Sequence, residues 1–215
     1  MPWAPLYASA DELREFVRID DSADDDQIAA ALDAASRSID YACDPREGYE
    51  RQFGKTDGQD ARWYTATVRG YGVPVRGQWV VETDDIADAT GLHVEIEDGT
   101  SPTVFVLGVV PLPRNADQRS RPFTAVGFAG STVPSPSPLA DAIRVTAVWG
   151  WPAVPATVRE ACLIQSSRLL ARRDAPFGVA GSAETQSEMR LLARLDPDVE
   201  NMIKPFVRKI GPVLA

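Results

Sequence analysis

The stretch IRVTAVWGWPAVPATVREACLIQSSRLLARRD, residues 143–174, changes from one periodicity to another within a few residues. Its first part alternates between apolar and more polar residues, which predicts a half-buried β-strand with an inner face of Ile143, Val145, Ala147 and Trp149. After Pro155, apolar residues fall on most faces of a helical projection, which predicts a central, buried helix. The protein is therefore expected to contain both a β part and a helical part.

The chain before this stretch alternates in the same way. From about Trp63 it carries runs rich in β-branched and aromatic residues, separated by Gly, Pro and Asp: WYTATV, QWVVE, LHVEIE and TVFVLGVV. In LHVEIE one face is apolar and the other carries His93, Glu95 and Glu97. An Asp98-Gly99 turn signal follows. We expect an antiparallel β-domain over residues 61–142.

The first sixty residues predict two helices. Ser9 and Glu12 have the spacing of a capping box, and Ser22 with Asp25 repeats it before a longer helix. That helix has an apolar stripe at alternating spacings of four and three, formed by Ile28, Leu32, Ala35, Ile39 and Ala42. Three aspartates, at 24–26, suit the positive end of its dipole, and Pro45 is expected to end it.

The carboxyl-terminal part predicts a connector and a short helix. The Gly-, Ala- and Ser-rich segment FGVAGSAETQSE, residues 177–188, is expected to be mobile. Asp196 is a suitable cap for a helix with Pro197 in its first turn, and Pro205 must end or kink that helix.

These observations predict an α+β protein. About four helices, from residues 1–60 and 143–215, form a helical core with a carboxyl-terminal arm, and residues 61–142 form an inserted antiparallel β-domain. The largest apolar stripes lie on the two long helices, so they are expected to form the core through Leu32, Ile39, Cys162 and Leu169.

Motifs that carry chemistry are scarce. A single histidine, His93, on a strand cannot supply an ordinary zinc site and should point to solvent or across a sheet. Cys43 and Cys162 fall in apolar helical patterns, so two buried thiols are expected rather than a disulfide or a reactive thiol. We find no phosphate-binding glycine loop and no nucleophile elbow. We expect no enzymatic activity, no metal and no cofactor.

The charge of the chain is −9 and is unevenly distributed. Residues 1–60 hold 15 of the 31 acidic residues and 6 of the 22 basic ones. An acidic front part repels phosphate, which disfavours sequence-independent DNA binding. We expect no membrane span, because no apolar run approaches about 20 residues, and no secretion signal in MPWAPLYASADEL.

Three blocks of this sequence resemble the head-to-tail connector (adaptor) proteins of tailed bacteriophages. The first is LREFVRIDDSADDDQIAAALDAASRSIDYAC, residues 13–43, and the second is VTAVWGWPAVPATVREACLIQSSRLLARRDAPFGVAG, residues 145–181. The third, LDPDVENMIKPFVR at residues 195–208, is similar to the closing signature of that family. Together the blocks cover about 80 of the 215 residues, in the family's order.

The resemblance implies a structural virion protein without enzymatic activity. Copies would form a ring, usually of twelve, beneath the portal. The ring would extend the DNA channel, join head to tail, carry the next neck protein and serve genome ejection without sequence-specific DNA contacts. The chain would be made in the host cytoplasm and end in the virion neck.

Other functions remain open. One is another neck or tail subunit, such as a stopper, a terminator or a capsid-decoration protein. A second is a DNA-packaging factor, for which a basic stripe is expected and not seen. A third is a carbohydrate-binding or hydrolytic β-module that uses surface tryptophans.

The arm at residues 196–215 is the candidate for docking on the portal. Its candidate residues are Asp196, Pro197, Met202, Ile203, Phe206, Val207, Arg208, Lys209 and Ile210. Such an apolar group is too large to leave in water, and its basic residues suit an acidic partner. The alternative is that the arm folds back on its own helical core.

Overall fold

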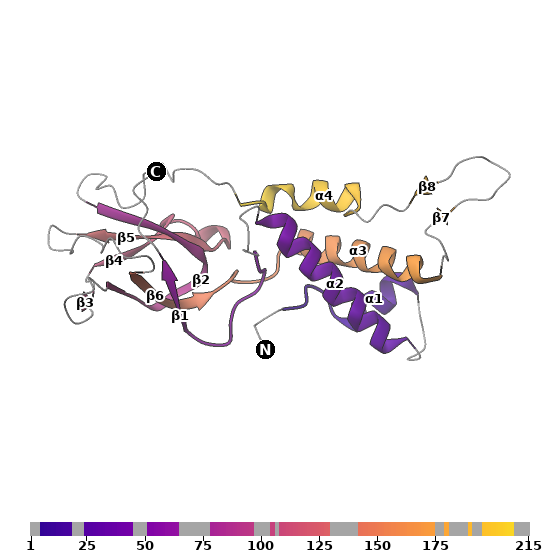
Figure 1. Cartoon of the computed structure of the whole chain (residues 1–215), viewed down its shortest axis with the longest axis horizontal. Helices are drawn as coiled ribbons and strands as arrows, with labels where there is room; N and C mark the ends of the chain where they lie inside the picture. The colour runs from indigo at the N-terminus through magenta and orange to yellow at the C-terminus, as the bar shows by residue number, and fades with distance from the viewer. Residues whose placement is uncertain are drawn as a thin grey trace. The chain divides into compact units, whose positions relative to one another are not determined.

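The computed structural model describes residues 5–18, 24–44, 51–64, 78–96, 104–105, 108–129, 142–174, 179–180, 189–190 and 195–208. They divide into two compact units. The helical unit combines the residues up to Gln52 with Val154–Arg208, and the β unit is formed by Phe53–Ala153. The predicted α+β class, with a helical part interrupted by an antiparallel β insertion, is confirmed (Figure 1).

The boundaries of the insertion differ from the predicted 60/61 and 142/143. They lie at 52/53 and 153/154, because strand β1 (Asp60–Tyr64) and strand β6 (Ile143–Trp149) pair with each other inside the β unit. WYTATV and IRVTAVW were both predicted as strands, but the sequence pattern did not show that they pair with each other.

The helical unit contains four α-helices among its described residues: α1 (Ala10–Val17), α2 (Asp25–Cys43), α3 (Ala156–Asp174) and α4 (Pro197–Ile203). The 3-10 turn η2 (Lys204–Phe206) follows α4, and two short strands, β7 (Val179–Ala180) and β8 (Met189–Arg190), pair antiparallel. Helix α3 contacts each of the other three helices, as its predicted central position requires (Figure 1).

The ends of α1 and α2 follow the predicted signals in part. The capping box of Ser9 and Glu12 is formed, since each side chain binds the other residue's backbone amide. Helix α2 instead has Asp24 as its N-cap, without a side-chain cap bond. The predicted cap Ser22, the predicted terminator Pro45 and most of the predicted mobile connector lie outside the described residues.

The core of the helical unit lies between α2 and α3. The two helices are antiparallel, because Ser36 of α2 lies by Cys162 while Ala31 lies by Ser166. Leu32, Ile39 and Cys162 are completely buried.

Leu169, the fourth residue predicted for the core, is only half-buried. Helix α4 begins beside Gln165 and Arg168 of α3, because its cap Asp196 binds both residues. Leu169 comes after these residues along α3. The turn of α3 beyond that point, Ser167–Leu170, is partly exposed on all sides because α4 does not extend over it.

The β unit is an antiparallel sheet with the strand order β1-β6-β2-β5-β4. Its remaining strands are β2 (Gln78–Ile96), β4 (Val109–Leu112) and β5 (Phe123–Ala129), and β3 (Val104–Phe105) pairs with β2. QWVVE and LHVEIE, expected as separate strands, belong to the single 19-residue strand β2. The first part of β2 pairs with β5, its later part pairs with β6, and bulges between them shift the register.

One face of the sheet is the core of the β unit. The predicted alternation in β6 is confirmed, since Ile143, Val145, Ala147 and Trp149 are fully buried and the residues between them are partly exposed. Val94 and Ile96 of β2 pack into the same cluster. The unit therefore has a hydrophobic core of its own, separate from that of the helices.

Candidate functional site

The segment predicted as a docking arm packs on its own helical unit over its described residues. Asp196 caps α4 and Pro197 occupies its first turn, as predicted. Val199, Ile203 and Phe206, spaced by four and three residues, are buried. This spacing provides the apolar stripe that α4 needs to pack against α3.

Polar contacts hold both ends of this segment. At its start, Asp196 pairs with Arg168 at 3.2 Å, and its amide donates to Gln165. At its end, the Phe206 carbonyl accepts a hydrogen bond from Arg51, and the Arg208 amide donates to the Cys43 carbonyl at 2.7 Å.

Over residues 196–208 the arm therefore folds back on its own helical core, which is the alternative to docking that the sequence left open. Of the candidate docking residues, Ile203, Phe206 and Arg208 are buried, and Met202 and Val207 are partly buried. Lys209 and Ile210 lie outside the described residues. Folding back satisfies the apolar groups that would otherwise be left in water.

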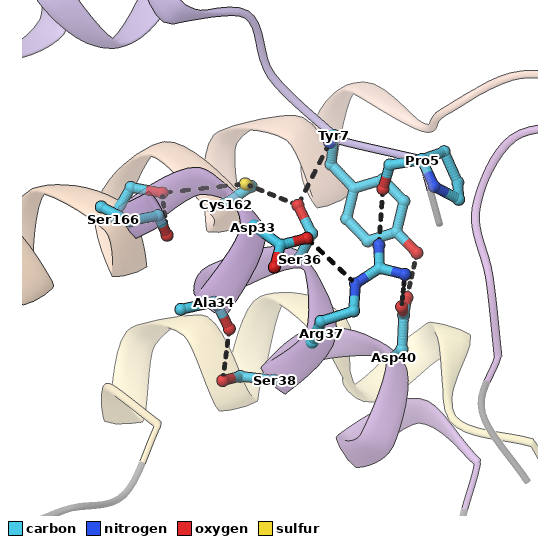
Figure 2. A network of polar contacts seen from close by, with 11 residues as sticks. Pro5, Tyr7, Asp33, Ala34, Ser36, Arg37, Ser38, Asp40, Cys162 and Ser166 are labelled. Carbon is cyan, nitrogen blue, oxygen red and sulfur yellow. Dashed lines mark hydrogen bonds and ion pairs between the residues drawn. The ribbon is translucent and has the colours of Figure 1, made fainter. Parts of the chain in front are cut away.

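A second set of polar contacts, which we call the strap network, joins the N-terminal strap (residues 5–8) to α2 (Figure 2). The Tyr7 hydroxyl donates to the carboxylate of Asp40, which also pairs with Arg37 at 3.1 Å. Arg37 donates to the Pro5 carbonyl at 2.6 Å, and the Tyr7 amide donates to the Ser36 hydroxyl at 3.3 Å. Because Asp40 is completely buried, the Tyr7 hydrogen bond and the Arg37 ion pair replace part of the hydration that its carboxylate would have in water.

The strap network continues from α2 into α3. The Ser36 hydroxyl lies 3.6 Å from the sulfur of Cys162, which is 3.9 Å from the hydroxyl of Ser166. Ser166 in turn donates to the Ala31 carbonyl of α2. Polar groups inside a helix interface specify one alignment, because any other alignment leaves them without partners.

Both cysteines are buried and neither is part of a disulfide, as predicted. Burial raises the pKa of the Cys162 thiol, against smaller opposing effects of Ser36, Ser166 and the backbone amides of Tyr7 and Ala8. A thiol with a raised pKa stays protonated at neutral pH and is a poor nucleophile. The cysteine at this position therefore acts as a small packing residue.

The GWP motif anchors the point where the chain leaves the β unit. The indole nitrogen of Trp151 donates to the buried Asp85 at 2.8 Å, and its ring lies 4.9 Å from that of Phe53. The Trp151 amide donates to the Gly54 carbonyl, so the incoming and outgoing chains are bonded together. Gly150 has a φ of 99°, a backbone conformation that favours glycine.

A polar cluster also lies beside the core of the β unit. The carboxylate of Asp84 accepts from the Tyr64 hydroxyl and from Arg62, each at 3.0 Å. The guanidinium of Arg62 lies 4.6 Å from the centre of the Trp149 ring. Burial, followed by the neighbouring Asp84, raises the pKa of Tyr64, so this phenol acts as a hydrogen-bond donor.

The opposite face of the sheet carries a cross-strand row in which Trp63 is exposed and Glu95 is buried. Trp63, Arg144 and Glu95 lie opposite one another on β1, β6 and β2. Arg144 pairs with Glu95 and lies 5.6 Å from the Trp63 ring, while Trp63 remains 41% exposed. His93, in the next row of this face, is partly exposed and is bonded through Nδ1 to the Gly91 carbonyl, in line with its predicted orientation away from the core.

Sequence reasoning missed the buried carboxylates at the centre of these arrangements. Asp40 directly follows Ile39 in the apolar stripe of α2, and Asp85 lies between the strand segments QWVVE and LHVEIE. For Asp40 the available signal was an acidic residue beside an apolar stripe, whereas Asp85 follows the polar run of residues 82–84 and offered no such signal. Its partners, Tyr7 and Trp151, come from distant parts of the chain, so no spacing rule could identify them.

Within the described ranges, no group of His, Cys, Asp and Glu side chains is arranged to hold a metal ion. None of the described helices is long and apolar enough to cross a membrane. Comparison with models of known protein families gave no match, and comparison with curated proteins found no significantly similar sequence.

Proposed function

We propose that the chain is a head-to-tail connector (adaptor) of a tailed bacteriophage, a structural subunit that forms a ring beneath the portal. One observation carries the proposal. The three blocks that resemble this family supply α1 and α2, then α3, then α4, and these helices pack into one unit although the β unit separates them in sequence. Blocks that belong to one functional module are expected to come together in this way.

The construction of the helical unit suits a ring subunit. A closed ring requires the same interface on every copy, which favours a rigid protomer. The contacts of Ser36 and Ser166 between α2 and α3, and those of Asp196 and Arg208, fix α2, α3 and α4 to one another through directional bonds. The β unit has its own core, so it can be inserted without changing the helical packing.

The charge of the front part suits a conduit for DNA. The side chains of Asp11 and Asp33 are 92% and 60% exposed, although each pairs with an arginine. Acidic side chains on a channel wall would repel phosphates and let DNA pass without sticking. We expect the first sixty residues, or loops of the β unit, to give the lumen a net negative surface.

The first test is assembly on the portal. Purified chain is mixed with the portal encoded in the same phage genome and imaged by negative-stain electron microscopy, with an unrelated phage's portal as the specificity control. The proposal expects an added ring on the cognate portal only. A chain that adds no density to its cognate portal would refute it.

The second test separates the adaptor from a DNA-packaging factor. Binding to duplex DNA is measured by fluorescence anisotropy over a range of salt concentrations. The adaptor is expected to bind weakly at physiological salt, since it carries no basic stripe. Tight, strongly salt-dependent binding would favour the packaging factor instead.

A further inference from the structure

The N-terminal strap is attached to the helical unit through a small set of contacts. Ser36, Arg37 and Asp40 of α2 bind its backbone and the Tyr7 hydroxyl (Figure 2). Tyr7 is its one large buried side chain, 2% exposed, whereas the neighbouring Leu6 is 45% exposed.

The strap lies over groups that have no exposure to solvent. Ser36, Asp40 and Cys162 are each completely buried. The Tyr7 amide donates to the Ser36 hydroxyl, which itself lies 3.6 Å from the sulfur of Cys162, so a single side chain connects the strap to the thiol. The seam between α2 and α3 at this level is therefore closed partly by the strap.

Helix α1, which follows the strap, is held by other contacts. Its capping box is formed by Ser9 and Glu12, Glu12 pairs with Arg159 of α3, and Leu13 is buried. Lifting residues 5–8 would leave these contacts in place. A segment with few buried apolar groups and independent flanking contacts opens at a lower free energy than the whole unit.

We propose that residues 5–8 form a latch that opens locally and controls access to the α2–α3 seam. The closed state is held by the Tyr7 hydroxyl on Asp40, and the open state exposes Cys162 without unfolding the helices. Such a latch would exist whether or not the chain assembles into a ring.

Thiol labelling tests the latch, because the two cysteines report on different events. Cys162 lies under the strap, whereas the buried Cys43 lies at the end of α2, where its carbonyl binds Arg208. Trypsin places them in separate peptides, residues 38–46 and 160–168. The full chain is exposed to iodoacetamide at mildly alkaline pH over a urea series below the unfolding transition, and each peptide is quantified by mass spectrometry.

The latch predicts that Cys162 reacts faster than Cys43 and with little dependence on urea, since a local opening exposes little surface. Tyr7→Phe should increase the Cys162 rate by about tenfold or more, because a hydrogen bond to a charged group is lost. Tyr41→Phe, on the same helix but 76% exposed, is the matched control and should change neither rate.

One result of the labelling experiment would refute the latch. If both cysteines of the unmodified chain react at one rate with the same steep urea dependence, the strap opens only when the whole unit unfolds and the latch is refuted. This comparison needs no variant. An unchanged Cys162 rate in Tyr7→Phe would also overturn the role given to the tyrosine.

Discussion

Replacing Ile203 with alanine measures how much the packing of α4 on α3 stabilises the helical unit. Ile203 is 2% exposed and lies on the face of α4 that packs on α3. The truncation removes three carbon atoms from a buried site, at about 0.8 kcal/mol for each, and leaves a cavity. We expect the free energy of unfolding of the helical unit to fall by about 2–5 kcal/mol.

The two units can be followed separately in one urea titration. Trp149 and Trp151 are buried in the β unit, so tryptophan fluorescence reports mainly on that unit. Circular dichroism at the helical band reports on α1 to α4. With an m-value of about 1.5–2 kcal/mol per molar urea, the helical midpoint should fall by roughly 1–3 M, while the fluorescence transition keeps its position.

Asn201→Ala is the matched control, since Asn201 is an exposed residue of the same helix. Its effect should stay within about 0.5 kcal/mol. If Ile203→Ala destabilises the helical unit no more than this control, α4 does not pack on α3 in the isolated chain. The docking arm proposed from sequence would then regain its support.

Two further predictions concern the cores. Leu32→Ala should cost about 2–5 kcal/mol because Leu32 is completely buried, whereas Leu169→Ala should cost less than half as much because Leu169 is only partly buried. Equal losses of stability in thermal unfolding would contradict the observed burial. Asp85→Ala leaves the indole N–H of Trp151 without its acceptor and should lower the stability of the β unit by about 1–3 kcal/mol. An unchanged fluorescence transition in that variant would show that the GWP anchor does not stabilise the unit.

Several features were determined by local sequence. The capping box at Ser9, the cap at Asp196 and the alternation in IRVTAVW each depend on residues a few positions apart, and each has the predicted form. The burial of both cysteines also followed from their apolar helical surroundings. Caps depend on hydrogen bonds to nearby amides, and alternation depends on the regular spacing of side chains along a strand. Both lie within one element, so the sequence pattern is sufficient to predict them.

The pairing of strands, the packing of helices and the partners of buried carboxylates depend on residues far apart in sequence, and only the tertiary structure showed them. The sequence could not show that β1 pairs with β6, that α4 folds back onto α3, or that α4 leaves Leu169 partly exposed. Nor could it pair Tyr7 with Asp40, or Trp151 with Asp85, across 33 and 66 positions. A buried carboxylate is stable only beside its donors, and which donors reach it is set by how the helices and strands pack.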